Sequence, residues 1–147
     1  MIDAIDDKIL HQLQRDGRVT NLQLAERVGL SPSACLRRVQ ALEAGGVIKG
    51  YRAVLDRTQL GAGLTVFVTV GLAGQLSRDA LAFERAMAEA PEVLECHHVT
   101  GSVEYLLRVE VADLAAYKHF HSDVLGTLSQ VSRITSYVCL GSSKDRA

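Results

Sequence analysis

The junction between two predicted helices constrains the fold of this chain more than any other feature of its sequence. Residues 20–28 have the apolar spacing of a short helix, and Gly29 is the residue type that most often follows a helix in a left-handed conformation. Ser31 and Pro32 then begin another helix, because serine caps a first turn and proline there lacks only an N–H that would be unpaired anyway. About three residues therefore join the two helices, which predicts a helix-turn-helix.

A further helix is predicted before this pair, over residues 3 to 16. Ile5, Ile9 and Leu13 recur at the spacing of one helix face, and the Asp16-Gly17 pair ends the pattern. The acidic residues near its start favour the helix dipole and are expected to be solvated: Asp3, Asp6 and Asp7. The chain is thus expected to open with a three-helix unit.

The third of these helices has a face suited to the major groove of DNA. At about 100° per residue, Cys35, Val39 and Leu42 share a core face. The opposite face combines short side chains with an arginine that can reach a guanine edge or a phosphate. The candidate DNA-binding residues here are Ser31, Ser33, Ala34, Arg37, Arg38 on the flank, and Gln40. Ordinary solvated arginines remain the alternative for Arg37 and Arg38.

The segment after this helix has the pattern of a small β-hairpin, or wing. Residues 47–54 alternate around Gly50, so Lys49 and Arg52 would flank a turn and contact the DNA backbone without reading its sequence. Residues 27–57 contain six basic and two acidic side chains, although the net charge of the whole chain is −1. This local excess favours double-stranded DNA as a partner.

The rest of the chain predicts a ferredoxin-like α+β domain. Its expected elements are a strand over residues 63–73, a helix capped by Ser77 and ended by Pro91, strands at 93–99 and 103–111 joined by Thr100-Gly101-Ser102, a helix at 114–128 and a strand at 131–140. In this βαββαβ order both helices cover one face of an antiparallel sheet. The predicted domains are 1–60, with a linker strand at about 51–60, and 61–147.

The other face of this sheet is expected to be an interface. The Leu, Val and Phe content of the predicted strands is too high for a face that meets water. We therefore expect subunits to pair through it.

The composition and the N-terminal sequence also indicate where in the cell the protein is expected. No apolar run approaches the ~20 residues of a membrane helix, and the N-terminus lacks the basic and apolar stretches of a secretory signal, so a cytoplasmic protein without membrane contact is expected. Cys35, Cys96 and Cys139 are widely spaced within predicted helices and strands, which favours free thiols over disulfides or a zinc cluster.

The histidines do not form a convincing metal site. His97 and His98 are consecutive in a predicted strand and point to opposite faces, while His119 and His121 diverge on a helix. No nucleophile with a base and no phosphate-binding loop accompanies them, so no metal and no catalytic residue is expected. An enzyme using the histidines and Glu104 as acid–base groups is the weakest alternative.

Four segments carry a resemblance that spans nearly the whole chain. They are DDKIL at residues 6–10, LAERVGLS at 24–31, RVQALE at 38–43 and GVIKGY at 46–51. In this order and spacing they closely resemble the Lrp/AsnC family, the leucine-responsive and feast/famine regulators. The resemblance implies dimers formed through the sheets, commonly four dimers in an octamer, and amino-acid effectors bound between dimers near the loop joining the second and third strands.

That loop is similar to the family's pattern but departs from it. GSVEYLL at residues 101–107 resembles Gly-x-x-Asp-Tyr-Leu-Leu, with Glu104 at the aspartate position and Ser102 where an acid often follows the glycine. Glu104 can accept the ammonium of an α-amino acid, while N–H groups around Gly101 and nearby hydroxyls can bind its carboxylate. The residues implied are His98, Thr100, Gly101, Ser102, Glu104, Tyr105 and Ser136. A hairpin glycine with solvated neighbours remains the alternative.

The sequence thus predicts a sequence-specific DNA-binding transcription regulator without cofactor or catalytic activity. An amino acid or related metabolite would change the assembly of its dimers, to the extent that it binds one assembly more tightly than another. An architectural DNA-binding protein that ignores metabolites is the other hypothesis.

Overall fold

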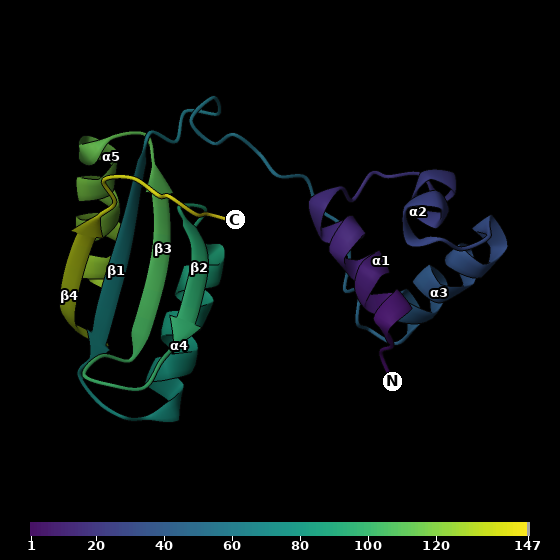
Figure 1. The fold of residues 1–147 in the computed structure, drawn as a ribbon. Coiled ribbons are helices and arrows are strands. Elements are labelled where there is room, and N and C mark those ends of the chain that lie inside the picture. Colours follow the sequence, from purple (N-terminus) through teal and green to yellow (C-terminus); the bar gives the residue numbers. More distant parts are fainter. Residues whose placement is uncertain (147) are drawn as a thin grey trace. The chain divides into compact units, whose positions relative to one another are not determined.

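The protein folds into two compact units, each with its own hydrophobic core (Figure 1). The computed structural model describes residues 1–146. The first unit is Met1–Val54 and the second begins at Leu55, whereas the sequence placed the boundary after residue 60.

Three helices make up the first unit, namely α1 (Ala4–Arg15), α2 (Asn21–Val28) and α3 (Pro32–Ala44). Their apolar faces meet in a core that contains Ile9, Leu24, Ala25, Cys35 and Leu42. The predicted helix-turn-helix is confirmed, and three residues separate α2 from α3. Leu22 and Leu36 are exposed, so the apolar stripe of these helices is narrower than their sequences indicate.

Capping side chains set the ends of these helices. Thr20 accepts a hydrogen bond from the Gln23 N–H at 3.2 Å and begins α2, and Gly29 ends it with φ of 75°. Ser31 accepts from the Ala34 N–H at 3.2 Å and begins α3. Because each cap satisfies orphan backbone groups, the tight turn is encoded locally.

The predicted wing strands are wrong. Within described residues 45–63 no residue lies in a β-strand. Gly46 has a φ of 76°, and the Ile48 N–H donates to the Leu42 carbonyl at 3.0 Å, which folds the chain back on the end of α3. Tyr51 donates its hydroxyl to Glu43 at 2.8 Å. The backbone of 47–54 thus has contacts to α3 but no partner strand for a ladder.

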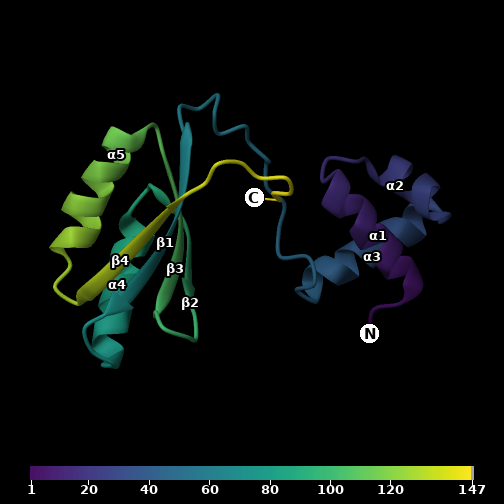
Figure 2. The same ribbon diagram turned by 60° about the vertical axis from the view of Figure 1, so that its left-hand side comes forward.

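The second unit is a four-stranded antiparallel sheet with helices on one face (Figure 2). Its strands are β1 (Leu64–Leu72), β2 (Val93–His98), β3 (Tyr105–Val111) and β4 (Val131–Val138), in the spatial order β2-β3-β1-β4. The helix α4 (Ser77–Glu89) follows β1, and α5 (Leu114–His119) follows β3. This is the predicted βαββαβ arrangement.

The core of this unit lies between the sheet and its helices. Alternate residues of β1 and β3 are buried there, together with the apolar stripes of the helices: Val66, Val68, Val70, Phe83, Met87, Tyr105, Leu107, Val109, Tyr117, Phe120 and Leu125. The period of two in each strand therefore assigns one face to the core.

The helices differ from their predictions in detail. Ser77 is the first helical residue of α4 and not its cap, since Leu76 occupies the cap position without a side-chain hydrogen bond. The single helix predicted for 114–128 is divided into α5, a π-helical turn (Phe120–Val124) and a 3-10 turn (Leu125–Thr127). Across the described residues, none of the helices combines the length and the hydropathy needed to cross a bilayer.

The open face of the sheet is more polar than predicted. Phe67, Leu106 and Tyr137 contribute apolar surface, but Arg108 at the centre pairs with Glu110 at 3.2 Å and with Asp145 at 2.6 Å. The segment after β4 crosses this face (Figure 1). The expectation of an apolar second face is therefore wrong, because the Leu and Val side chains of β1 and β3 are mostly directed to the helices.

Candidate functional site

The exposed face of α3 carries the DNA-binding candidates of the first unit. Ser33, Arg37 and Gln40 are exposed, and Ala34 is half-buried. The Asn21 side chain donates to the Pro32 carbonyl at 2.8 Å and ties the start of α2 to the first turn of α3. Among the described residues Arg37 has no ion-pair or hydrogen-bond partner, so its guanidinium is available to an external acceptor.

Arg38 is engaged differently from its neighbour. Its Nη1 lies 2.8 Å from Asp3 Oδ2 and 3.0 Å from Asp6 Oδ1, at the start of α1. Arg38, a DNA-binding candidate in the sequence, is therefore paired within the fold. The expectation of a solvated carboxylate is not met at Asp6, whose side chain is 13% exposed, whereas Asp3 is 53% exposed and caps α1. Sequence reasoning missed this contact because it joins residues more than thirty positions apart.

Two further basic residues lie after α3. Lys49 and Arg52 are exposed, and neither pairs with an acid in the part of the chain that the structure describes. They do not flank a β-turn, because the predicted hairpin is not formed. Their charges nevertheless remain on an extended segment of the first unit.

The loop between β2 and β3 forms the second candidate site. The Val99 N–H donates to the Glu104 carbonyl at 2.9 Å and closes the hairpin, and Gly101 has a φ of 124°. This backbone conformation is strained for residues with a Cβ, so a glycine is needed at the tip. Thr100 and Ser102 are exposed beside it.

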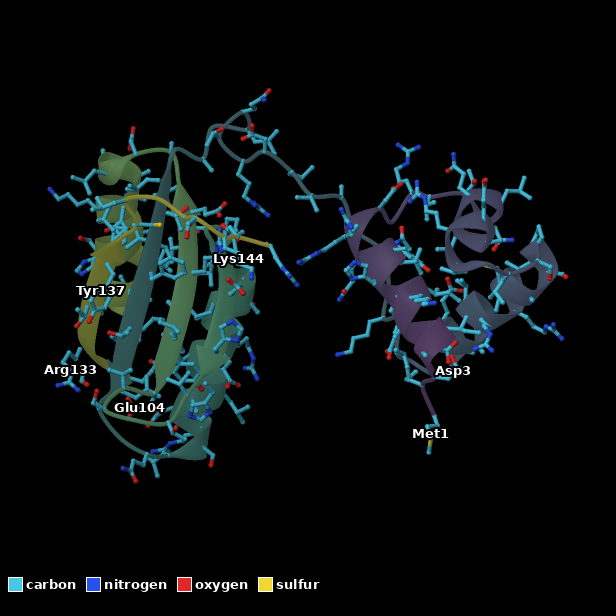
Figure 3. All side chains as sticks on the ribbon, in the orientation of Figure 1. Met1, Asp3, Glu104, Arg133, Tyr137 and Lys144 are labelled. Atoms are coloured by element: carbon cyan, nitrogen blue, oxygen red, sulfur yellow. The ribbon has the colours of Figure 1, made fainter. Side chains whose placement is uncertain are left out.

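Glu104 and Arg133 lie at the same end of the sheet (Figure 3). Glu104 Oε2 accepts the Leu72 N–H at 2.8 Å, and Arg133 donates to the Ser102 carbonyl at 2.9 Å. A Cβ built on Gly71 between them would lie 3.6 Å from Glu104 Oε2 and 3.7 Å from Arg133 Nε. The negative charge of Glu104 and the positive charge of Arg133 therefore both lie next to Gly71, which has no side chain.

Sequence reasoning did not find Arg133. It lies on β4, thirty-one residues from Ser102, and reaches the hairpin only because β4 pairs with β1 opposite Gly71. The register of two strands far apart in sequence placed it there, and no local motif signals it.

The side chains of the other three effector candidates already have partners within the sheet unit. Tyr105 is fully buried, and its hydroxyl donates to Glu84 at 2.8 Å; burial and this carboxylate raise the pKa of the phenol. His98 stacks on the Tyr105 ring with centroids 4.7 Å apart. Ser136 shares a hydrogen bond with the Tyr117 hydroxyl on the helix-covered face. The structure therefore does not bring Tyr105 or Ser136 to the hairpin tip.

The remaining polar residues do not assemble into another centre. His97 lies 3.4 Å from Glu95, on the opposite face of β2 from His98, and His119 pairs with Asp123 at 2.6 Å. Among the described residues no group of three or more potential ligands is placed to hold a metal ion. All three cysteines are free thiols.

Family models match both halves of the chain. A model described as the Lrp/AsnC ligand binding domain matches residues 65–147, and one described as a winged helix-turn-helix DNA-binding domain matches residues 2–49. Together they cover both compact units.

Individual relatives agree with these matches. The leucine-responsive regulatory protein of Rhizobium meliloti is 42% identical over 144 residues, which is 98% of this chain and 92% of that protein. A transcriptional regulator from Neisseria meningitidis in complex with L-methionine is 37% identical, with a TM-score of 0.95, and covers 99% of this chain and 94% of its own. A feast or famine regulatory protein from M. tuberculosis, also complexed with L-methionine, is 32% identical with a TM-score of 0.86, over 99% and 96% of the two chains.

Proposed function

Because the chain belongs to the Lrp/AsnC family of DNA-binding transcription regulators, we propose that it reads an operator with α3 and responds to an α-amino acid held in its sheet unit. The single observation that carries the first part is the exposed face of α3. Its short side chains allow close approach to base edges, and the unpaired Arg37 can reach a guanine or a phosphate.

Lys49 and Arg52 add affinity rather than sequence preference. Both are exposed and unpaired among the described residues, which suits contacts to phosphate oxygens beside the groove. Ser31, Ser33, Ala34 and Gln40 complete the reading surface. Arg38 is left out of it, because two carboxylates already hold its guanidinium.

The effector site is proposed at the end of the sheet where Glu104 and Arg133 converge. Glu104 Oε1 is not the oxygen that accepts the Leu72 N–H, so it can accept the ammonium of an amino acid. Arg133 would bind the carboxylate, which the sequence had assigned only to N–H groups and to the hydroxyls of Thr100 and Ser102. Gly71 leaves the space between the two charges clear of a side chain. The L-methionine complexes of two structural relatives support an amino acid as the ligand class.

Assembly is proposed to couple the two sites. Subunits would pair through the open sheet face, and dimers would associate further, as an octamer in the fullest form. An effector bound near the hairpin changes DNA affinity only if it favours one assembly over another. Since a transcription regulator works on the chromosome, we place the protein in the cytoplasm.

Binding to operator DNA in the presence of a panel of amino acids tests the proposal. A duplex is selected from random sequence with the full-length chain, and its affinity is measured with each amino acid in turn. At least one amino acid is expected to shift that affinity. If the chain binds the selected duplex but no amino acid, by calorimetry, the architectural alternative replaces the effector proposal.

A further inference from the structure

We propose that Arg38 is a positioning residue for DNA recognition, which clamps α3 to the start of α1 through Asp3 and Asp6 and does not itself contact DNA. The inference rests on the proposal above that α3 reads the operator. It assigns a different role to each of two consecutive arginines, Arg37 and Arg38.

The carboxylates of Asp3 and Asp6 each take part both in the helix cap of α1 and in the ion pairs to Arg38. Asp3 uses Oδ1 to accept the N–H groups of Ile5 and Asp6, at 2.9 and 2.8 Å, and gives Oδ2 to Arg38. Asp6 uses Oδ2 to accept the Asp3 N–H at 3.2 Å and gives Oδ1 to Arg38. The capping box of α1 and the ion pairs to α3 therefore hold the same two side chains in fixed positions.

The Asp6 end of the clamp is more buried than an ordinary surface ion pair, whereas the Asp3 side chain is 53% exposed. The Asp6 side chain is 13% exposed and that of Arg38 is 33% exposed. An ion pair that is largely removed from water is costly to break, because the partner left behind keeps its desolvation without its counter-charge. Asp3 is the N-cap residue that precedes α1, and Figure 3 labels it there.

This anchor point fixes how α3 is rotated about its own axis. Successive residues of a helix differ by about 100° in direction, so holding Arg38 against α1 sets the direction in which Arg37 points. The core contacts of Cys35 and Leu42 hold the buried face, and the clamp adds a polar constraint on the flank. A small rotation of α3 would misplace a bidentate arginine at a base edge.

The two possible roles of Arg38 predict opposite effects when Asp6 is neutralised. If Arg38 contacts DNA, Asp6→Asn frees a guanidinium and removes a negative charge near phosphates, so operator affinity rises. If Arg38 is a clamp, Asp6→Asn loosens α3 and the preference for operator over unrelated DNA falls, even though the net charge is more favourable. The operator affinity of Asp6→Asn, compared with that of a variant carrying the same charge change elsewhere, therefore decides between them.

The experiment compares the full-length wild type with Asp6→Asn, Arg38→Gln and the double variant. Asp7→Asn is the matched control, because Asp7 is an exposed neighbour that makes the same charge change without touching Arg38. Affinities are measured for the selected operator and for a scrambled duplex of equal composition, over a salt series. Circular dichroism is used to choose a temperature at which every variant is folded, and the affinities are measured at that temperature.

The clamp predicts that Asp6→Asn and Arg38→Gln each lower the operator-to-scrambled ratio by about tenfold, as expected when one base contact of α3 is misplaced. The double variant should be no worse than Arg38→Gln, and Asp7→Asn should keep the wild-type ratio. Arg38→Gln should keep the wild-type salt slope, since no phosphate contact is lost.

An operator affinity that rises more for Asp6→Asn than for Asp7→Asn, or a salt slope for Arg38→Gln that is shallower by about one, would overturn the clamp and assign Arg38 to a phosphate. Unchanged ratios in all variants would also overturn it. These outcomes are distinct from failure of the reading surface itself, which would appear as unchanged base preference in Arg37→Ala while the clamp variants still lose stability.

Discussion

Arg37 is the side chain on which operator reading is expected to depend most. Arg37→Ala removes an exposed, unpaired guanidinium from the middle of α3, and we expect a loss of ~1–3 kcal/mol in operator affinity with relaxed preference at one base position. Binding to a library with each operator position varied measures both. Lys49→Ala is the control, because it should weaken all sequences similarly and reduce the salt slope. Unchanged discrimination in Arg37→Ala would exclude this residue as a base contact.

The effector site makes a second prediction at the level of single charges. Glu104→Gln keeps the size of the side chain but removes its charge, and Arg133→Gln removes the positive charge proposed to bind the effector carboxylate while leaving a shorter polar side chain. Each should weaken effector binding by ~1.5–3 kcal/mol while operator affinity without effector barely changes. Calorimetry with the amino acid found in the panel measures this.

Glu89→Gln is the control for that pair, since Glu89 is exposed at the end of α4 and lies outside the proposed site. Equal effector affinity in Arg133→Gln and the wild type would remove Arg133 from the site and leave the carboxylate to the hairpin N–H groups and hydroxyls.

Sequence reasoning identified residues whose role is local and missed those whose role depends on register. Gly29 was assigned as the residue that ends one helix and Ser31 as the residue that begins the next, each from its residue type, and both act as predicted. Sequence reasoning placed Arg38 on the flank of the helix but still counted it as a DNA-binding candidate, because the acids that hold it lie at the start of another helix. Tyr105 sits within the matching hairpin pattern, yet β3 turns its ring into the core.

At the scale of elements, the same distinction explains what was predicted correctly. Each helix of the first unit, and the alternation of β1 and β3, follows from periodicity and caps within one segment. The predicted strands of the wing do not form. Alternation of apolar and polar residues in 47–54 is compatible with a strand, but a strand also needs a neighbouring strand to hydrogen-bond with. The π-helical turn in 120–124 inserts one residue into a helical pattern, which the spacing of apolar residues does not reveal.

The start of α1 should be sensitive to acid. The hydrogen bond from Arg38 is the main reason that the pKa of Asp3 falls from its ordinary 3.8 to about 2. A carboxyl group with a lowered folded-state pKa stabilises the fold above its unfolded pKa and loses that contribution as pH falls through its folded pKa. Asp3 should therefore stabilise the first unit at neutral pH and lose this effect between pH 4 and about 2.

Thermal unfolding of the wild type and Asp3→Asn, followed by circular dichroism from neutral pH down to pH 2, measures the effect. The variant should unfold at a lower temperature near pH 7, and the gap should narrow progressively from about pH 4 to about pH 2, as the wild-type carboxyl becomes protonated as well. Asp7→Asn is measured alongside as the variant with the same charge change, because Asp7 does not contact Arg38. A gap that stays constant with pH would contradict the assignment of the lowered pKa to this ion pair.

At the scale of the whole molecule, the open sheet face decides whether two reading helices can act together. A single first unit can contact only one half-site, so tight operator binding requires a stable pair of chains. Phe67, Leu106 and Tyr137 supply the apolar part of that face. At its centre Arg108 pairs with Glu110 and Asp145, and Arg57 pairs with Glu110 at 3.2 Å, so the charges balance. This mixed surface is compatible with an interface, since fully buried polar groups are tolerated when they are paired.

Tyr137→Glu tests this interface in the full-length chain. Tyr137 is 56% exposed, so the folded subunit should accept the change, whereas a second copy packed on it would bury an unpaired carboxylate. Leu81→Glu is the control, because Leu81 is 59% exposed on α4, which covers the other face of the sheet. Sedimentation should find smaller assemblies for Tyr137→Glu only, together with weaker operator binding and an unchanged half-site affinity. If both variants assemble as the wild type does, subunits pair elsewhere and the open face must have another role.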